Sequence, residues 1–98
     1  MTIEIKKAGT DALVELCGRL DTTTAPVLEK AINEEISENI NLTIDLKELD
    51  YISSAGLRVL LSAQKRMRRS GSMKLRNVCE EVMDIFEMTG FADILEFA

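Results

Sequence analysis

The chain has 98 residues, of which 46% are hydrophobic and 30% charged, and its formal net charge is −5. This length suits a single core and excludes two domains. No apolar run of about 18 residues and no signal-peptide pattern is present, so we expect a cytoplasmic protein without a membrane span. Because nucleic acids and anionic lipids are themselves negatively charged, neither a nucleic acid nor a membrane is expected as a partner.

The N-terminal residues predict a β-hairpin. Ile3 and Ile5 alternate with polar residues, as in a strand with one covered face. Residues 12–17 continue in the extended sense after a Gly-Thr-Asp sequence that is typical of a turn. Because the two segments are joined so tightly, we expect them to pair with each other.

A first helix is predicted after the hairpin. Thr22, Thr23 and Thr24 are N-cap candidates, and Pro26 suits the first helical turn. Apolar residues then recur at helical spacing, namely Leu28, Ala31, Ile32 and Ile36. We expect this helix to end near Asn39.

The middle of the chain predicts a strand, a helix and a further strand. Leu42, Ile44 and Leu46 alternate with polar residues, and so do Met73 and Leu75. Between the two strands we expect a helix from about residue 54 to residue 69, followed by the stop signal Gly71. Its apolar stripe consists of Leu57, Leu60, Leu61 and Met67.

The C-terminal residues predict one more helix, which stops at Gly90. Its inward-facing side chains are expected to be Cys79, Val82, Met83 and Phe86. Residues 91–97 are compatible with a short helical turn or with a final edge strand, and periodicity does not decide between them.

This order of elements predicts a single α/β domain over residues 1–98. Successive strand–helix–strand crossovers that step the same way across a sheet place their helices on the same face. The alternating strands also indicate that only one face of the sheet is covered. We therefore expect a mixed four- to five-stranded sheet with helices mainly on one face, a polar opposite face, and a free chain that is monomeric.

Several kinds of chemistry are excluded by residue types that the chain lacks. There is no histidine, so neither Ser–His–Asp nor Cys–His catalysis is available, and no imidazole can bind a metal. No glycine-rich nucleotide-binding motif occurs. The sequence therefore predicts a protein that is not an enzyme and that uses no cofactor or metal.

Cysteines and basic residues have ordinary structural explanations. Cys17 and Cys79 match neither zinc-ligand spacing nor a disulfide scaffold, and we expect both to be reduced, partly buried thiols. A basic cluster lies toward the C-terminus of the predicted helix 54–69, where cations complement the helix dipole. The cluster consists of Lys65, Arg66, Arg68 and Arg69.

The most informative segment is the junction of the third strand with its helix, at Ser53 and Ser54. Serine is a common N-cap, and its oxygen can satisfy a free amide there without any other role. The same helix end has unpaired N–H groups and partial positive charge, so an anion attached to Ser54 would be favoured. Either reading puts an addressable hydroxyl at this junction.

Three neighbouring residues each have two explanations at this point. Gly56 is either tolerated near a helix end or leaves room for another backbone to approach Ser54. Asp21 either caps the Thr-rich turn or, as a resemblance to a known family implies, makes a contact beside Ser54. Arg58, four residues after Ser54 on the same helical face, is either a solvated charge or a ligand of a phosphate or a partner.

The string Tyr-Ile-Ser-Ser-Ala-Gly-Leu-Arg at residues 51–58 resembles the signature of the anti-sigma factor antagonists, the bacterial members of the STAS domain family. Residues 18–21 resemble the family's early loop, and residues 86–91 its late helix ending. Together they extend the resemblance over nearly all of the chain. Many relatives carry Asp before the acceptor serine, whereas this chain has Ser53.

This resemblance implies a STAS-like fold and a switchable binding protein. The unphosphorylated form would bind an anti-sigma factor that is also a serine kinase and release the sigma factor. Phosphorylation of Ser54, with Ser53 as the second candidate, would switch binding off, and a PP2C-type phosphatase would act on the phosphorylated form. The partner contacts so implied are Asp21, Thr22, Thr23, Ser53, Ala55, Gly56, Leu57 and Arg58.

Two other functions remain open on the same fold. One is a STAS scaffold or ligand-binding module that binds a nucleotide, a lipid or another protein without phosphate transfer. The other is a partner switch that acts on a phosphatase or a secretion regulator in place of a sigma factor.

Overall fold

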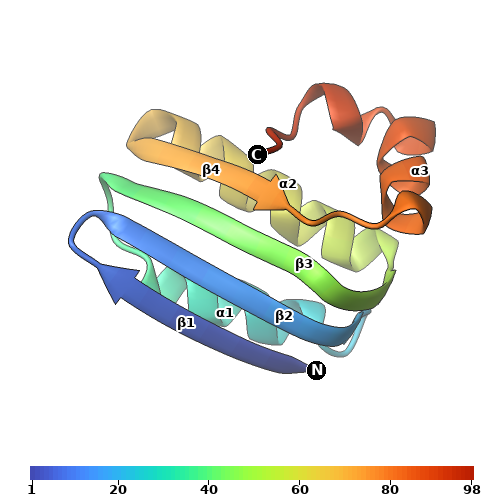
Figure 1. The fold of residues 1–98 in the computed structure, drawn as a ribbon, viewed down its shortest axis with the longest axis horizontal. Helices are drawn as coiled ribbons and strands as arrows, with labels where there is room; N and C mark the ends of the chain where they lie inside the picture. The colour runs from blue at the N-terminus through green and yellow to red at the C-terminus, as the bar shows by residue number, and fades with distance from the viewer.

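The computed structural model describes all 98 residues as one four-stranded sheet with helices packed against it. Its strands lie in the order β1-β2-β3-β4; β1 and β2 are antiparallel, and β2, β3 and β4 are parallel. Figure 1 shows the elements, which are β1 (Thr2–Ala8), β2 (Asp11–Leu20), α1 (Ala25–Glu35), β3 (Ile40–Ile52), α2 (Ser54–Arg69), β4 (Gly71–Arg76), α3 (Glu80–Thr89) and the 3₁₀ helix η1 (Phe91–Asp93). The predicted hairpin and single α/β domain are confirmed.

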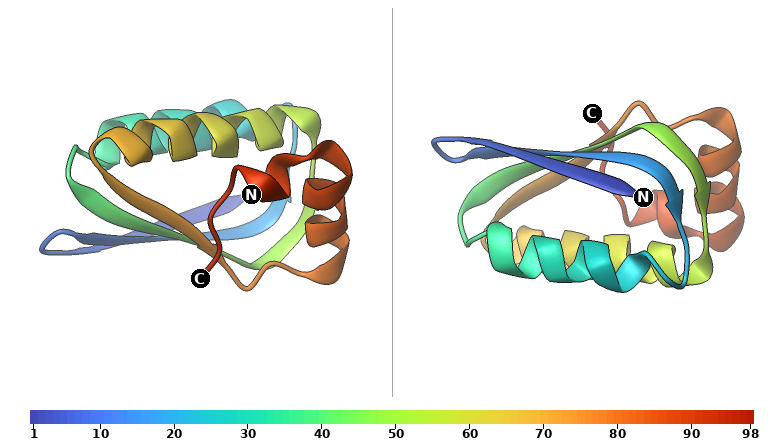
Figure 2. Two further views of the ribbon diagram at one scale, coloured as in Figure 1. Left: turned by 90° about the horizontal axis from the view of Figure 1, so that it is seen from above. Right: turned by 90° about the horizontal axis from the view of Figure 1, so that it is seen from below.

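Two helices cover one face of the sheet. Figure 2 shows α1 and α2 side by side on that face, while α3 stands at the end of the sheet where β3 and β4 finish. This arrangement of α1 and α2 confirms the expectation of helices mainly on one side of the sheet. Separately, no helix is both long and apolar enough to cross a membrane.

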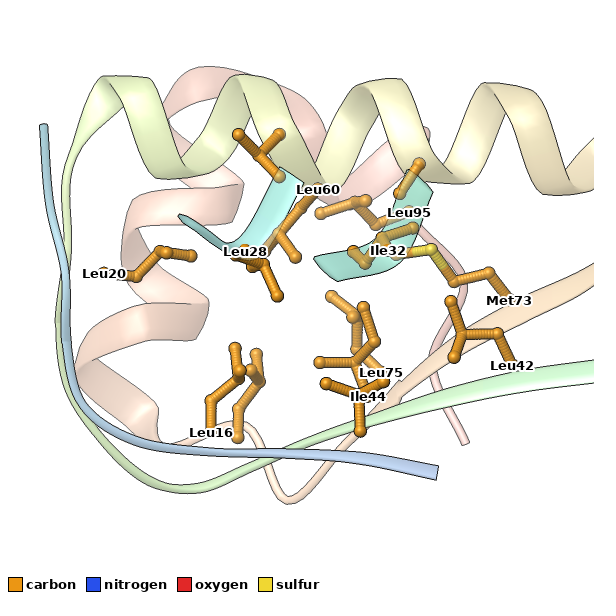
Figure 3. Close-up of a cluster of buried hydrophobic side chains, with 14 of the residues drawn as sticks. Leu16, Leu20, Leu28, Ile32, Leu42, Ile44, Leu60, Met73, Leu75 and Leu95 are labelled. Carbon is orange, nitrogen blue, oxygen red and sulfur yellow. The ribbon is translucent and has the colours of Figure 1, made fainter. Parts of the chain in front are cut away.

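The core lies between the sheet and the two long helices. The inward positions of β2 are Ala12, Val14 and Leu16, which are buried and alternate with more exposed residues, as a strand with one covered face requires. Figure 3 shows how leucines and isoleucines from strands and helices meet in this space. Leu60 of α2, Leu28 of α1 and Ile44 of β3 are all fully buried there.

The first helix ends earlier than predicted, at Glu35 and not near Asn39. Ile36 is already extended, and Asn39 adopts a left-handed backbone with φ of 62°, which starts the turn into β3. The guanidinium of Arg66 in α2 donates hydrogen bonds to the carbonyl oxygens of Ile32 and Ile36. The Ile32 carbonyl also accepts the Ile36 N–H, so Arg66 adds a second partner there and supplies a tertiary partner for the Ile36 carbonyl. Sequence periodicity does not reveal these contacts.

Residues 91–97 form the predicted short helical turn and not a final edge strand. The helix η1 is followed by an isolated parallel bridge between Phe97 and Leu75 of β4. The side chain of Gln64, fully buried in α2, holds this segment: its amide accepts a hydrogen bond from the Glu96 N–H (3.1 Å) and donates one to the Met73 carbonyl (3.2 Å). Gln64 therefore lies in the core, whereas Leu61 of the predicted stripe is only partly buried.

Both cysteines are exposed, so the prediction of partly buried thiols is wrong. Cys17 follows the inward-facing Leu16 on β2, and alternation turns it to the open face. Cys79 is the N-cap residue of α3 and lies just before the helix, not on its buried side.

The open face of the sheet carries one buried acidic group, Asp45, whose side chain is 8% exposed. Burial alone would raise its pKa. Hydrogen bonds from the Lys47 N–H (2.9 Å), Arg76 (3.0 Å) and Asn77 (3.2 Å) outweigh burial, so the pKa of Asp45 lies below its usual value. This group ties β3 to the end of β4.

Candidate functional site

The two hydroxyls at the start of α2 have different environments. Ser53 is the N-cap residue, with an extended backbone (φ −96°, ψ 173°), and its Oγ accepts a hydrogen bond from the Gly56 N–H at 3.3 Å. Ser54 is the first helical residue; it is exposed, and its Oγ is not used in capping. The helix end is therefore capped by one serine, while the next serine presents a free hydroxyl to solvent.

The loop that follows β2 lies directly beside this junction. The strands β2 and β3 are parallel, and their last residues, Leu20 and Ile52, are paired. The Ser53 N–H continues this pairing by donating a hydrogen bond to the Leu20 carbonyl at 2.9 Å. Because the carboxyl ends of parallel strands meet at one edge of a sheet, the loop from Asp21 to Thr24 and the hydroxyl of Ser54 share that edge.

Asp21 organises this loop from within. Its Oδ1 accepts hydrogen bonds from the N–H groups of Thr23 and Thr24, both at 3.0 Å. The Thr24 amide above all, helped by that of Thr23, holds the pKa of the Asp21 carboxyl below its usual value. Asp21 thus caps the Thr-rich turn, whereas Thr24 is the N-cap residue of α1 without a side-chain cap, and Thr22 and Thr23 are exposed.

Gly56 has a packing role that sequence reasoning missed. A Cβ built there would lie 2.7 Å from Cγ of Leu20 and 3.0 Å from Cγ1 of Ile52. The missing side chain therefore lets α2 settle against the ends of β2 and β3, and it leaves no opening for another protein. Leu57 likewise points into the core and is only 4% exposed.

These two residues correct the predicted set of partner contacts, because buried side chains cannot form a surface. The exposed members of that set are Thr22, Thr23, Ser54 and Arg58, while Asp21, Ser53 and Ala55 are partly exposed. Arg58 forms no ion pair and lies one turn after Ser54 on α2.

The electrostatics of the junction favour an added anion. The first turn of α2 contains no acidic residue, and the last turn contains the basic residues Arg66, Arg68 and Arg69. The partial positive charge at this N-terminus is therefore not cancelled by carboxylates of the same turn. In addition, no group of three or more His, Cys, Asp or Glu side chains is placed to hold a metal ion.

A further pair at the same edge was not predicted as part of the site. The guanidinium carbon of Arg19 lies 4.3 Å from the centre of the Tyr51 ring, and the two residues are paired across β2 and β3. Both belong to the strings that carry the family resemblance, but only the strand register shows that they meet.

Comparison with known proteins agrees with this architecture. The profile of the STAS domain matches residues 2–98. A relative from Listeria monocytogenes, named anti-sigma-B factor antagonist, is 36% identical over 98% of this chain and 87% of its own. An anti-sigma factor antagonist from Mycobacterium paratuberculosis has a similar fold, with a TM-score of 0.86, 22% identity, and coverage of 98% of this chain and 83% of the other.

The fold also resembles that of a Bacillus cell fate determinant, SpoIIAA, solved in its phosphorylated form. That similarity has a TM-score of 0.72 at 16% identity and covers 99% of this chain and 91% of the other. Because the profile match extends over nearly the whole length, this chain belongs to the STAS domain family.

Proposed function

We propose that this chain is an anti-sigma factor antagonist controlled by phosphorylation of Ser54. In its unmodified form it binds an anti-sigma factor that is also a serine kinase, and the sigma factor held there is released. Transfer of phosphate to Ser54 ends that binding, and a PP2C-type phosphatase restores the active form. The chain acts in the cytoplasm as a binding protein and not as an enzyme.

The observation that supports this proposal most directly is that only one of the two serines caps the helix. Ser53 is engaged with the Gly56 N–H, whereas Ser54 is exposed at the first position of α2. A kinase can reach the Ser54 hydroxyl without breaking the cap. We therefore place the modification on Ser54 and not on Ser53.

Charge explains how a small modification would change binding. A phosphate adds about −1.5 to −2 charge and strong acceptor oxygens. In a complex that covers Ser54, this group would have to lose its water and face whatever acidic groups the partner presents. In the free chain, the N-terminus of α2 stabilises an anion by about 0.3 to 1 kcal/mol. The switch thus acts on the interface and leaves the fold intact.

The test uses the anti-sigma factor kinases encoded in the same genome. Each purified kinase is incubated with the wild-type chain, Ser54→Ala, Ser53→Ala and Ser54→Asp, with and without ATP. We expect intact mass to rise by one phosphate in the wild type and in Ser53→Ala only. We expect calorimetry to show that Ser54→Ala retains its affinity for the kinase. The affinity of Ser54→Asp should fall at least about tenfold, which corresponds to about 1.4 kcal/mol of binding free energy.

Two results would contradict the proposal. Phosphate retained on Ser54→Ala would move the site to another residue. An absence of both binding and phosphorylation with every such kinase would overturn the assignment as an antagonist. Circular dichroism of each variant shows whether a loss of binding reflects a loss of fold.

A further inference from the structure

We propose that Arg19 and Tyr51 form a preorganised contact that determines the affinity of this chain for the kinase that modifies Ser54. This inference rests on the proposed function and extends it to residues outside the segment 53–58. The kinase surface that it requires is an apolar patch that covers the Tyr51 ring, with a hydrogen-bond acceptor beside it for the Arg19 guanidinium.

The location of the pair follows from strand register. Arg19 pairs with Tyr51, Leu20 pairs with Ile52, and the Ser53 N–H bonds to the Leu20 carbonyl. Tyr51 is three residues before Ser54, so their Cα atoms are at most about 11 Å apart. A standard interface covers roughly 800 Å² on each partner, which is a disc of about 16 Å radius. A partner seated on Ser54 with a footprint of that size reaches Tyr51.

The exposure of the pair is not explained by packing. Tyr51 is 39% exposed and is one of the few large apolar side chains on the surface, while the Arg19 side chain is 62% exposed. At the ends of β2 and β3, Leu20 and Ile52 point into the core. The residues before them, Arg19 and Tyr51, therefore point outward. Arginine and tyrosine are also enriched among hot-spot residues, the few residues that contribute most of the binding energy at an interface.

The two side chains are already in contact in the free chain. The guanidinium stacks on the ring at 4.3 Å, and Arg19 Nε lies 3.9 Å from Oδ2 of Asp21. Asp21 is itself held by the N–H groups of Thr23 and Thr24. Association usually costs free energy for ordering long side chains at the interface. Contacts that Arg19 already makes in the free chain lower this cost. Asp21 therefore acts as a positioning residue for Arg19.

The experiment measures the dissociation constant of the unphosphorylated chain for the cognate kinase, together with KM and kcat for phosphorylation of Ser54. The variants are Tyr51→Ala, Tyr51→Phe and Arg19→Ala. The matched control is Arg69→Ala, which removes an exposed arginine at the far end of α2, about 22 Å from Ser54 along the helix. Urea unfolding of every variant separates lost contacts from lost stability.

We expect Tyr51→Ala and Arg19→Ala to raise both the dissociation constant and KM at least about tenfold while kcat stays within about twofold. Tyr51→Phe keeps the ring and is expected to stay within about threefold of the wild type, as is Arg69→Ala. Because Arg19 is mostly exposed, Arg19→Ala tests the pair even if Tyr51→Ala fails to fold.

The outcomes distinguish this inference from the proposed function. If the wild type binds and is phosphorylated on Ser54, but Tyr51→Ala or Arg19→Ala binds as tightly as the wild type, the inference is overturned and the proposed function stands. If the wild type neither binds nor accepts phosphate, the proposed function is overturned and the inference with it.

Discussion

The Ser53 amide donates a hydrogen bond to the Leu20 carbonyl at 2.9 Å, and this contact joins the end of β3 to the end of β2. It brings the Asp21 loop, which is 32 residues earlier in the chain, to the start of α2. The exposed Ser54 hydroxyl, the turn held by Asp21 and the Arg19–Tyr51 pair all meet at this edge of the sheet.

The two serines are predicted to contribute unequally to stability. Ser53→Ala removes the side-chain acceptor of the Gly56 N–H and should lower the free energy of unfolding by about 1 kcal/mol. Ser54→Ala removes an exposed hydroxyl and should change it by less than about 0.5 kcal/mol. Urea unfolding of both variants checks this. Equal losses would show that both hydroxyls contribute to the cap.

Replacing Gly56 with alanine is predicted to destabilise the domain even though alanine is the better helix former. Alanine gains up to about 1 kcal/mol in helix propensity. Its Cβ, however, would lie 2.7 Å from Leu20 Cγ, and such overpacking costs about 1 to 3 kcal/mol. We expect a net loss in the free energy of unfolding.

Chemical denaturation of Gly56→Ala measures that loss, and the double variant Gly56→Ala with Leu20→Ala provides the control. Because Leu20→Ala removes the Leu20 atoms that clash and leaves only Ile52 Cγ1 at 3.0 Å, the second substitution should recover part of the cost of the first beyond simple additivity. A stabilised Gly56→Ala single variant would contradict the close contact.

Stability is predicted to fall in acid through Asp45. The native pKa of Asp45 is depressed, so its contribution is present above the unfolded value of about 3.9 and is lost as the pH drops through the native value. Asp45→Asn cannot titrate, so the stability gap between wild type and variant should narrow below about pH 4. Unfolding midpoints from pH 7 to pH 2 measure that gap.

Asp50→Asn is the matched control for this pH series, because Asp50 is an exposed aspartate of the same strand that forms no ion pair. Its unfolding midpoint should follow that of the wild type throughout. A gap between wild type and Asp45→Asn that stays constant down to pH 2 would show that the hydrogen bonds of Asp45 do not favour its ionised form.

Gln64 is predicted to hold the C-terminal segment in place. Gln64→Leu keeps a similar volume but leaves the buried Met73 carbonyl and the partly buried Glu96 N–H without this partner, at a cost of about 1 to 3 kcal/mol. Hydrogen exchange should show faster exchange at the amides of Glu96 and Ala98, the second of which donates to the Leu75 carbonyl. Protection that survives in Gln64→Leu would mean that packing of Leu95 and Phe97 suffices.

Lys65→Leu serves as the control for Gln64→Leu, because it places the same side chain on the exposed face of α2 one residue away. We expect its free energy of unfolding to stay within about 0.5 kcal/mol of the wild type and its C-terminal amides to keep their protection.

Local pattern was sufficient for the elements of this fold. Alternation in residues 42–46 and 73–75 predicted β3 and β4, helical spacing predicted α2 over residues 54–69, and Gly90 ends α3 with φ of 80°. These features depend on backbone sterics and on one covered face, both of which can be read from neighbouring residues. An exposed hydroxyl at the junction of the third strand with its helix was also predicted, and the structure assigns capping to Ser53 and exposure to Ser54.

Tertiary structure alone decided which residues meet. Arg66 of α2 bonds carbonyls at the end of α1, and Gly56 is required because Leu20 lies against it. Arg19 meets Tyr51 only through the register of β2 with β3. Each of these contacts joins residues about 30 or more positions apart. They arise because a helix or strand packs closely against its neighbour. The spacing of residues along one segment does not encode that packing.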